Sequence, residues 1–142
     1  MKETGLSQIA FDLDGVFIPD CDQFPNVGGL DAFYAMTSYM RPIFCPVVDY
    51  SIITARPAQY RSVTHSWCEK YFPIKPIRLY HELTTETPEE YKAQVLNNNT
   101  DIHMYVESDP KIVSYLRDNV KTACLIVHFS EYLERKLNLR DS

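Results

Sequence analysis

The strongest constraint on this chain is a short apolar run, residues 9–11, that ends in two aspartates one residue apart, Asp12 and Asp14, followed by Gly15. A buried strand delivers its last side chains to the rim of a sheet, where Gly15 lets the backbone turn sharply. The single intervening residue points both carboxylates to the same face. Carboxylates this close repel each other unless a cation lies between them or one holds a proton. The segment therefore predicts a Mg²⁺ site or a nucleophile with an acid, against the simpler alternative of an Asp-Gly turn.

Composition limits the classes of protein to consider. The chain has 142 residues, of which 45% are hydrophobic and 23% charged, so we expect one domain, residues 1–142, with a sizeable core. A formal net charge of −5 argues against a general nucleic-acid backbone binder and leaves a local basic patch open. We expect no membrane-spanning segment and no secretory signal. The four cysteines are scattered without a CxxC pair, which favours reduced thiols, no zinc site and a cytoplasmic location.

Apolar runs of strand length alternate with segments of helical period. The expected strands are Gln8–Phe11, Tyr50–Ile53, Ile77–Tyr80, Ile102–Val106 and Ala123–Val127. The expected helices are Leu30–Tyr39, Pro57–Tyr71, Pro88–Asn97, Pro110–Asn119 and one that begins near Glu131. This alternation predicts an α/β fold, a doubly wound, Rossmann-like, mainly parallel five-stranded sheet with helices on both faces.

Three of the expected helices begin with a proline at the first helical position. Thr87 and Glu90 flank Pro88 as a capping box, and the pairs Asp109-Pro110 and Arg56-Pro57 have the same form. In the second helix, Val63, Trp67 and Tyr71 recur at the spacing of a core-facing stripe.

Polar residues follow the expected strands, where doubly wound sheets bind their ligands. In chain order they are Asp12 and Asp14, then Thr54-Ala55-Arg56, then Lys92 on a helix, and finally Glu107-Ser108-Asp109. Carboxylates, a hydroxyl and an ammonium are the parts of a metal-assisted phosphoryl-transfer site.

From about residue 8 to residue 128, the chain resembles the haloacid dehalogenase-like phosphohydrolase superfamily, in its small type without a cap domain. The segment Asp12-Leu13-Asp14-Gly15-Val16 matches the first motif of that family, and Ile52-Ile53-Thr54-Ala55-Arg56 resembles the second. Lys92 stands where the third-motif lysine is expected, and Tyr105-Val106-Glu107-Ser108-Asp109-Pro110 resembles the acidic fourth motif. These motifs occur in the family's order.

The resemblance implies roles for single residues. Asp12 is the expected nucleophile, which forms an aspartyl-phosphate, and Asp14 the general acid/base, whose backbone carbonyl is the metal ligand. Thr54, with the neighbouring Ala55, is expected to bind the phosphoryl group, and Lys92 to neutralise its charge. Lys111 is the competing lysine, and Lys92 has the alternative of a surface ion pair with Glu89.

Two positions stay open. Arg56 either clamps substrate or is a solvated residue before a helix. Family members often carry an aspartate where Ser108 stands, so Glu107, Asp109 or both must supply the anionic ligand of the expected Mg²⁺, with or without help from the Ser108 hydroxyl. We rank Glu107 first because Asp109 also suits the N-cap of the next helix. A chain that lacks a strong ligand binds Mg²⁺ weakly, which is the route to an inactive relative.

No second domain fits between the motifs, so the site is expected to be open, with residues 20–26 overhanging it. An open site accepts a bulky phosphoester end or uses a partner subunit as its lid, which leaves a homo-oligomer possible. We expect a phosphorylated substrate, with nucleotides or nucleic-acid phosphate ends preferred and small metabolites as the alternative. The alternative from another functional class is a catalytically weak or inactive module that binds phosphorylated ligands or a protein partner.

Overall fold

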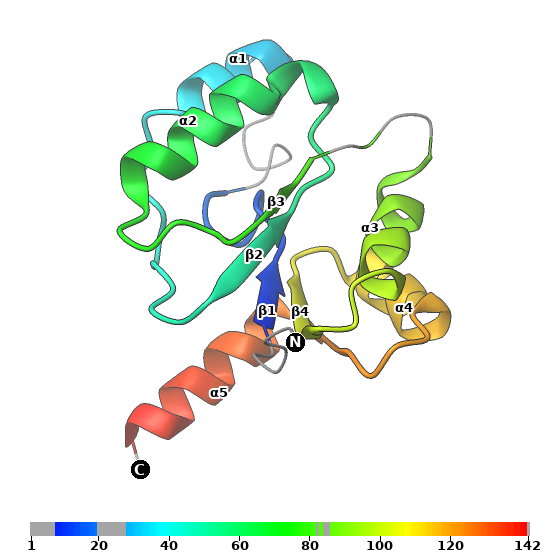
Figure 1. Ribbon diagram of the computed structural model, residues 1–142. Coiled ribbons are helices and arrows are strands. Elements are labelled where there is room, and N and C mark those ends of the chain that lie inside the picture. The colour runs from blue at the N-terminus through cyan, green and yellow to red at the C-terminus, as the bar shows by residue number, and fades with distance from the viewer. Residues whose placement is uncertain (1–7, 20–27, 82, 84–85, 142) are drawn as a thin grey trace, which may run out of the picture.

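The fold is an α/β sandwich built on one parallel sheet (Figure 1). The computed structural model describes residues 8–19, 28–81, 83 and 86–141. Its strands are β1 (Gln8–Phe11), β2 (Tyr50–Ile53), β3 (Leu79–Tyr80), β4 (Ile102–Glu107) and β5 (Leu125–His128). Its helices are α1 (Leu30–Thr37), α2 (Arg61–Tyr71), α3 (Pro88–Asn97), α4 (Pro110–Asn119) and α5 (Phe129–Asp141), with a 3₁₀ turn, η2 (Ala58–Tyr60), before α2.

The five strands lie in the order β3-β2-β1-β4-β5, and all their pairings are parallel. The chain builds outward from β1 to β3 and then returns to the other side of β1 with β4. The direction of winding therefore switches between β1 and β4, which is where an open parallel sheet binds its ligands. The predicted doubly wound, Rossmann-like fold is confirmed, and no separate cap domain occurs in the described ranges.

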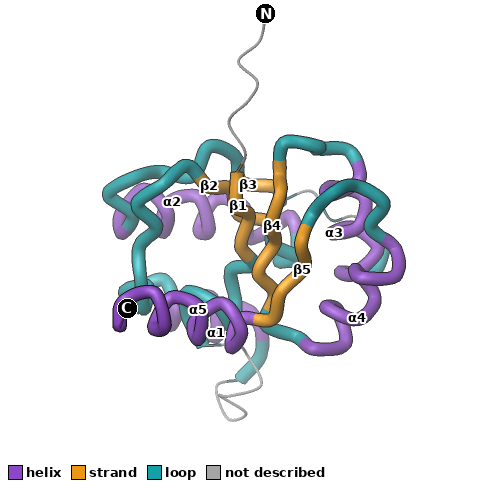
Figure 2. Tube along the Cα trace, turned by 90° about the horizontal axis from the view of Figure 1, so that it is seen from below, coloured by secondary structure: helices purple, strands orange, loops and turns teal. Residues whose placement is uncertain are grey.

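Helices cover both faces of the sheet. Figure 2 shows α2 and α5 on one side of the strands and α3 and α4 on the other. The side of α2 and α5 holds an aromatic core with Phe11, Tyr50, Trp67, Phe72 and Tyr132. The opposite core includes Ile53, Leu96, Tyr105, Leu116 and Ile126. Two buried layers hold the central strands in place, so the loops after β1, β2 and β4 start from fixed points.

A proline at the first helical position correctly predicts the start of two helices, but not that of the third. α3 begins at Pro88 with the full capping box, since the Thr87 hydroxyl and the Glu90 carboxylate each accept from the other's backbone N–H. Asp109 caps α4. The prediction of a helix from Pro57 is wrong: its ψ of 149° is extended, and α2 begins at Arg61. The φ of proline suits an extended chain as well as a helix.

Other bounds differ by a few residues. β3 is shorter than predicted, β5 starts later, and α5 starts at Phe129 rather than near Glu131. The buried stripe of α2 contains Thr64, Trp67 and Cys68, so Trp67 faces the core as expected while Val63 stands at its margin. The predicted overhang at residues 20–26 lies outside the described residues. No helix in the described ranges is long and apolar enough to cross a membrane.

Candidate active site

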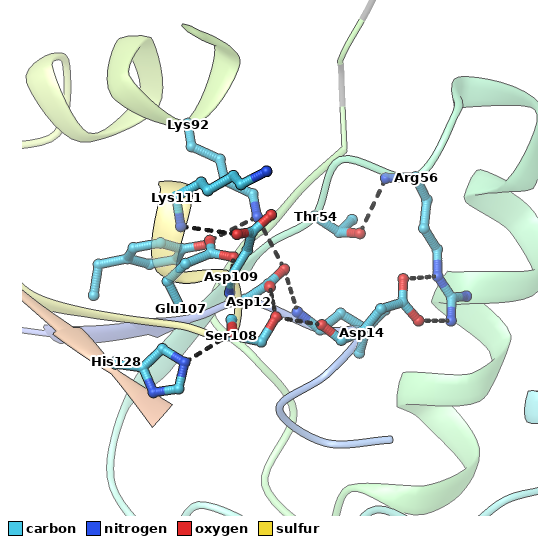
Figure 3. Close-up of polar contacts among 12 residues, drawn as sticks. Asp12, Asp14, Thr54, Arg56, Lys92, Glu107, Ser108, Asp109, Lys111 and His128 are labelled. Carbon is cyan, nitrogen blue, oxygen red and sulfur yellow. Dashed lines mark hydrogen bonds and ion pairs between the residues drawn. The ribbon is translucent and has the colours of Figure 1, made fainter. Parts of the chain in front are cut away.

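The carboxyl ends of β1, β2 and β4 surround an open pocket of about 220 Å³. Its walls contain every site residue predicted from the sequence, namely Asp12, Asp14, Thr54, Ala55, Arg56, Lys92, Glu107, Ser108 and Asp109. Among the described residues, Tyr34, Pro88 and Ile112 also line the pocket and were not predicted. The topology thus brings together side chains that lie far apart in the chain, as Figure 3 shows for Asp12, Thr54 and Lys92.

The turn after β1 sets the direction of the two aspartates. The backbone N–H of Asp12 donates to the carbonyl of Val106 at 2.9 Å, so the pairing of β1 with β4 continues to this residue. Leu13 is fully buried in the core, while Asp12 and Asp14 on either side of it line the pocket. Gly15 then adopts a φ of 88°, which lets the chain turn away without a Cβ clash.

Lys92 links Asp12 to Glu107 beneath the pocket. Its Nζ lies 3.1 Å from Oδ1 of Asp12 and 2.8 Å from Oε1 of Glu107. All three side chains are buried, and Tyr105 donates its hydroxyl to the same Glu107 oxygen at 2.8 Å. α3 therefore carries the lysine that meets Asp12, as predicted, whereas Lys111 is exposed and its ammonium makes no ion pair with a described residue.

One ammonium between two buried carboxylates leaves an excess of negative charge. Burial, reinforced by the Glu107 carboxylate, raises the pKa of Asp12 well above its ordinary value, and Lys92 offsets this only in part. Burial pushes the pKa of Glu107 upward, but Lys92 outweighs it and lowers that pKa. Burial disfavours the charged Lys92, yet the two carboxylates raise its pKa. Asp12 is thus the group that gains most from a further positive charge in the pocket.

The Ser108 hydroxyl contacts both Asp12 and Asp14. Its hydroxyl lies 3.0 Å from Oδ2 of Asp12 and 3.1 Å from the backbone carbonyl oxygen of Asp14. The carbonyl of Ser108 in turn accepts the Nε2–H of His128 at 2.9 Å. Three oxygens of different chemical type therefore converge at one point on the pocket wall.

These oxygens suit Mg²⁺, although the carboxylate cluster that would hold a metal by itself is missing. No group of three or more His, Cys, Asp or Glu side chains able to hold a metal ion occurs in the described part of the chain. Magnesium commonly takes one or two carboxylates and completes its octahedron with water and substrate phosphate. The set of Asp12 carboxylate, Asp14 carbonyl and Ser108 hydroxyl fits that pattern.

Glu107 and Asp109, the carboxylates expected to supply the anionic metal ligand, accept hydrogen bonds from other groups of the protein. Glu107 accepts from Lys92 and Tyr105 with one oxygen, and from the backbone N–H of Asp109 with the other, at 3.1 Å. Asp109 accepts from the backbone N–H of Lys111 at 2.9 Å with its Oδ1 and thereby caps α4. Glu107 therefore forms an ion pair with Lys92, and Asp109 is the N-cap of α4.

Thr54 and Arg56 belong to the same sequence motif but make different contacts in the pocket. The Thr54 hydroxyl accepts the backbone N–H of Arg56 at 3.2 Å, and its own proton donates to no described residue. Arg56 is buried, with 4% of its surface exposed, so the alternative of a solvated residue is wrong. Its guanidinium holds the Asp14 carboxylate with two hydrogen bonds, at 2.9 and 2.7 Å.

His81 lies just after β3 and is buried. Neither of its ring nitrogens has a hydrogen-bond partner among the described residues, and burial lowers its pKa. It does not line the pocket.

Comparison of the chain with models of protein families, with curated proteins and with solved structures found no match. The fold and the site by themselves define an α/β protein with a polar pocket at the switch point of a parallel sheet.

Proposed function

We propose that this chain is a Mg²⁺-dependent phosphomonoester hydrolase of the haloacid dehalogenase type, which works through an aspartyl-phosphate on Asp12. The observation that carries the proposal is the position of the Asp12 carboxylate, in the pocket between the Lys92 ammonium and the Ser108 hydroxyl. Lys92 and Ser108 hold the two oxygens at a fixed orientation, which is what a positioned nucleophile needs.

Each neighbouring group has a role in this reaction. Thr54 donates its hydroxyl proton, which no described residue accepts, to an oxygen of the phosphoryl group, and Lys92 neutralises charge on the carboxylate and the phosphoryl group together. Asp14 takes the proton of the water that hydrolyses the intermediate. Glu107 and Tyr105 keep Lys92 aimed at Asp12.

Asp12, the Asp14 carbonyl and Ser108 are the groups that hold Mg²⁺ in this proposal. The ion supplies positive charge that screens the repulsion between the anionic nucleophile and the anionic substrate. The proposal keeps the cytoplasmic location that the sequence predicts, and it includes nucleotides and nucleic-acid phosphate ends among the substrates.

The second candidate is a module that binds phosphorylated ligands without turning them over. It is favoured by the ion pairs that already occupy Asp14 and Glu107, because these leave a single carboxylate facing the metal. Such a protein would still present Lys92 and the Thr54 hydroxyl to an anion.

The test is phosphate release from a panel of mononucleotides, oligonucleotide ends, sugar phosphates and aryl phosphates, with and without Mg²⁺. Asp12→Asn is the matched variant, because it keeps the shape and removes the nucleophile, and we expect turnover to fall by at least about 10³-fold. Undiminished turnover by Asp12→Asn would contradict the proposal. A folded wild-type protein that binds the panel and releases no phosphate supports the second candidate.

A further inference from the structure

β5 is one of the two outer strands of the sheet, and no further strand lies beyond it in the described part of the chain (Figure 2). An outer strand presents a row of backbone N–H and C=O groups with which another chain can pair. The opposite outer strand, β3, has only two residues, and such a short edge resists pairing by itself. β5 has four residues, and Leu125 within it is 46% exposed. The edge of β5 is therefore the place where this sheet is open to extension.

Side chains from α4 and α5 cover the outward backbone groups of β5. Arg117 donates to the carbonyl oxygen of Ile126 from its Nε at 3.1 Å and from a terminal nitrogen at 2.9 Å. Glu131 accepts the backbone N–H of His128 at 3.0 Å. Backbone groups of alternate residues in a strand point to the same side, so Ile126 and His128 present their N–H and C=O groups along one edge. That edge is the outer one, since β4 pairs with the other side of the strand.

The two covering side chains also bind each other. The terminal nitrogen of Arg117 that reaches Ile126 lies 3.2 Å from Oε1 of Glu131, which is the oxygen that accepts the His128 N–H. We call these linked contacts the Arg117–Glu131 bridge. It runs along the edge from the Ile126 carbonyl to the His128 amide, where the backbone of a sixth strand would lie. Exposed ion pairs contribute little to stability, so the informative property of this pair is its position.

Glu131 has a simpler role as well. It lies three residues after His128, and its contact with the His128 amide caps the start of α5. Capping accounts for that contact, but it does not account for the two hydrogen bonds that Arg117 donates to Ile126 from another helix. An informative variant must therefore keep the cap and remove the contact with Ile126.

We infer that Arg117 closes the outer edge of β5 and thereby keeps a second copy of this chain from adding its own β5 strand to the sheet. A second copy fits this edge because two identical strands, placed antiparallel about a two-fold axis, are complementary. Ile126 of each copy then exchanges its N–H and C=O with Ile126 of the other, as directly opposed residues do in an antiparallel pair. A hollow of about 330 Å³ beside the edge, lined by Val120, Cys124 and Leu125 among others, has room for side chains of the added strand. The inference does not depend on the proposed reaction, because Arg117 does not line the site pocket.

The experiment measures the average mass in solution by analytical ultracentrifugation over a wide range of protein concentrations. The double variant Arg117→Ala, Glu131→Gln opens the bridge without changing the net charge, and the glutamine oxygen still caps α5. Its average mass is expected to rise with concentration from one chain towards two. Wild type and the single variant Glu131→Gln keep the bonds from Arg117 to Ile126 and are expected to stay at one chain. A folded double variant that stays at one chain overturns the inference.

Amide hydrogen exchange locates the contact. The Ile126 N–H of the double variant is expected to exchange more slowly at high protein concentration than at low. Association without slower exchange at Ile126 overturns the inference, and so does slower exchange at Ile126 in an associating wild type, because the edge is then open with Arg117 in place.

Two further variants complete the test. Lys121→Ala removes a charge from an exposed position near α4 without touching β5, so it is the matched control and is expected to stay at one chain. Association of Lys121→Ala would overturn the assignment to Arg117. Arg117→Lys keeps the charge but lacks the fork that reaches the Ile126 carbonyl and the Glu131 carboxylate together, so it is expected to associate more weakly than the double variant. If the double variant does not fold, an Arg117→Lys protein that stays at one chain overturns the inference.

Discussion

The Nε2–H of His128 donates to the carbonyl oxygen of Ser108 at 2.9 Å, from the end of β5 to the end of β4. The Nδ1 of the same ring accepts the backbone N–H of Ser130 at 3.1 Å, so its partners assign the neutral ring that carries its proton on Nε2. A side chain from outside the pocket thus fixes the backbone of the residue whose hydroxyl meets Asp12.

We predict that His128→Ala weakens both Mg²⁺ binding and turnover, because Ser108 loses its anchor. One hydrogen bond contributes about 1 kcal/mol, so an effect of about five- to tenfold on kcat/KM is expected. His128→Gln keeps an N–H of similar reach and is expected to recover part of the loss. Equal activity of wild type and His128→Ala in a titration with Mg²⁺ would show that Ser108 needs no such anchor.

Replacement of Lys92 by methionine tests the buried charge cluster. Removal of one partner from a buried ion pair typically costs about 3–5 kcal/mol, and here two carboxylates, Asp12 and Glu107, are left facing each other. Without the ammonium, the pKa values of both carboxyls rise in the folded state, so the folded protein binds more protons than the unfolded one. The free energy of unfolding of Lys92→Met should therefore increase as the pH falls from about 7 to about 5.

Denaturant titrations at the two pH values measure this effect. Lys111→Met is the control, since an exposed lysine contributes less than about 0.5 kcal/mol. A Lys92→Met protein as stable as wild type at both pH values would mean that the three side chains are not coupled.

The raised pKa of Asp12 predicts that Mg²⁺ binding releases protons. A metal binds the ionised carboxylate, so a carboxyl with a raised pKa must lose its proton first, and apparent affinity rises with pH. Titration calorimetry in two buffers of different ionisation enthalpy measures the number of protons released. Binding without proton release, or unchanged release by Asp12→Asn, would place the ion elsewhere.

Ser108→Asp is predicted to strengthen Mg²⁺ binding, because it adds an anionic oxygen where the hydroxyl now touches Asp12 and the Asp14 carbonyl. The same change places a further carboxylate beside Asp12. Repulsion between these carboxylates should lower the stability of the metal-free protein. Thermal unfolding with and without Mg²⁺ checks both effects in one experiment. If Mg²⁺ does not change the thermal unfolding of this variant, the proposed ligand set is wrong.

Phe11→Ala is predicted to destabilise the fold by about 3–5 kcal/mol. Phe11 is fully buried, and its ring centre lies 5.3 Å from that of Phe17, 5.6 Å from that of Phe44 and 5.5 Å from that of Tyr132. Fluorescence of the single tryptophan follows the unfolding. Val47→Ala, at an exposed position, should change stability by less than about 0.5 kcal/mol.

The sequence predicts the fold well where local chemistry decides it. β1, β2, α3 and α4 have the predicted bounds, because apolar runs define the two strands and a capping residue with proline begins each of the two helices. Pro57 misleads for a local reason as well, since its ring fixes φ and leaves ψ free.

The pocket gathers the residues that the sequence singles out, but the sequence does not indicate all of the contacts among them. Strand ends gather Asp12, Thr54 and Lys92 at one edge, which a parallel topology dictates. Nothing in the periodicity indicates that Arg56 reaches back across 42 residues to Asp14, or that Tyr34 on α1 stacks against it. Such pairings depend on the packing of helices over the sheet, which a single sequence does not specify.

The wide separation of the site residues along the chain has a consequence for folding. Lys92 meets Asp12 across 80 residues, and Ser108 meets it across 96. Contacts of such high sequence separation form only after long loops have closed, which slows the search for the native topology. We therefore expect anion binding to be among the last properties that a refolding chain recovers, later than its helical signal. A fragment that stops before β4 lacks Ser108 and Glu107, and with them the contacts that these two side chains make to Asp12 and Lys92.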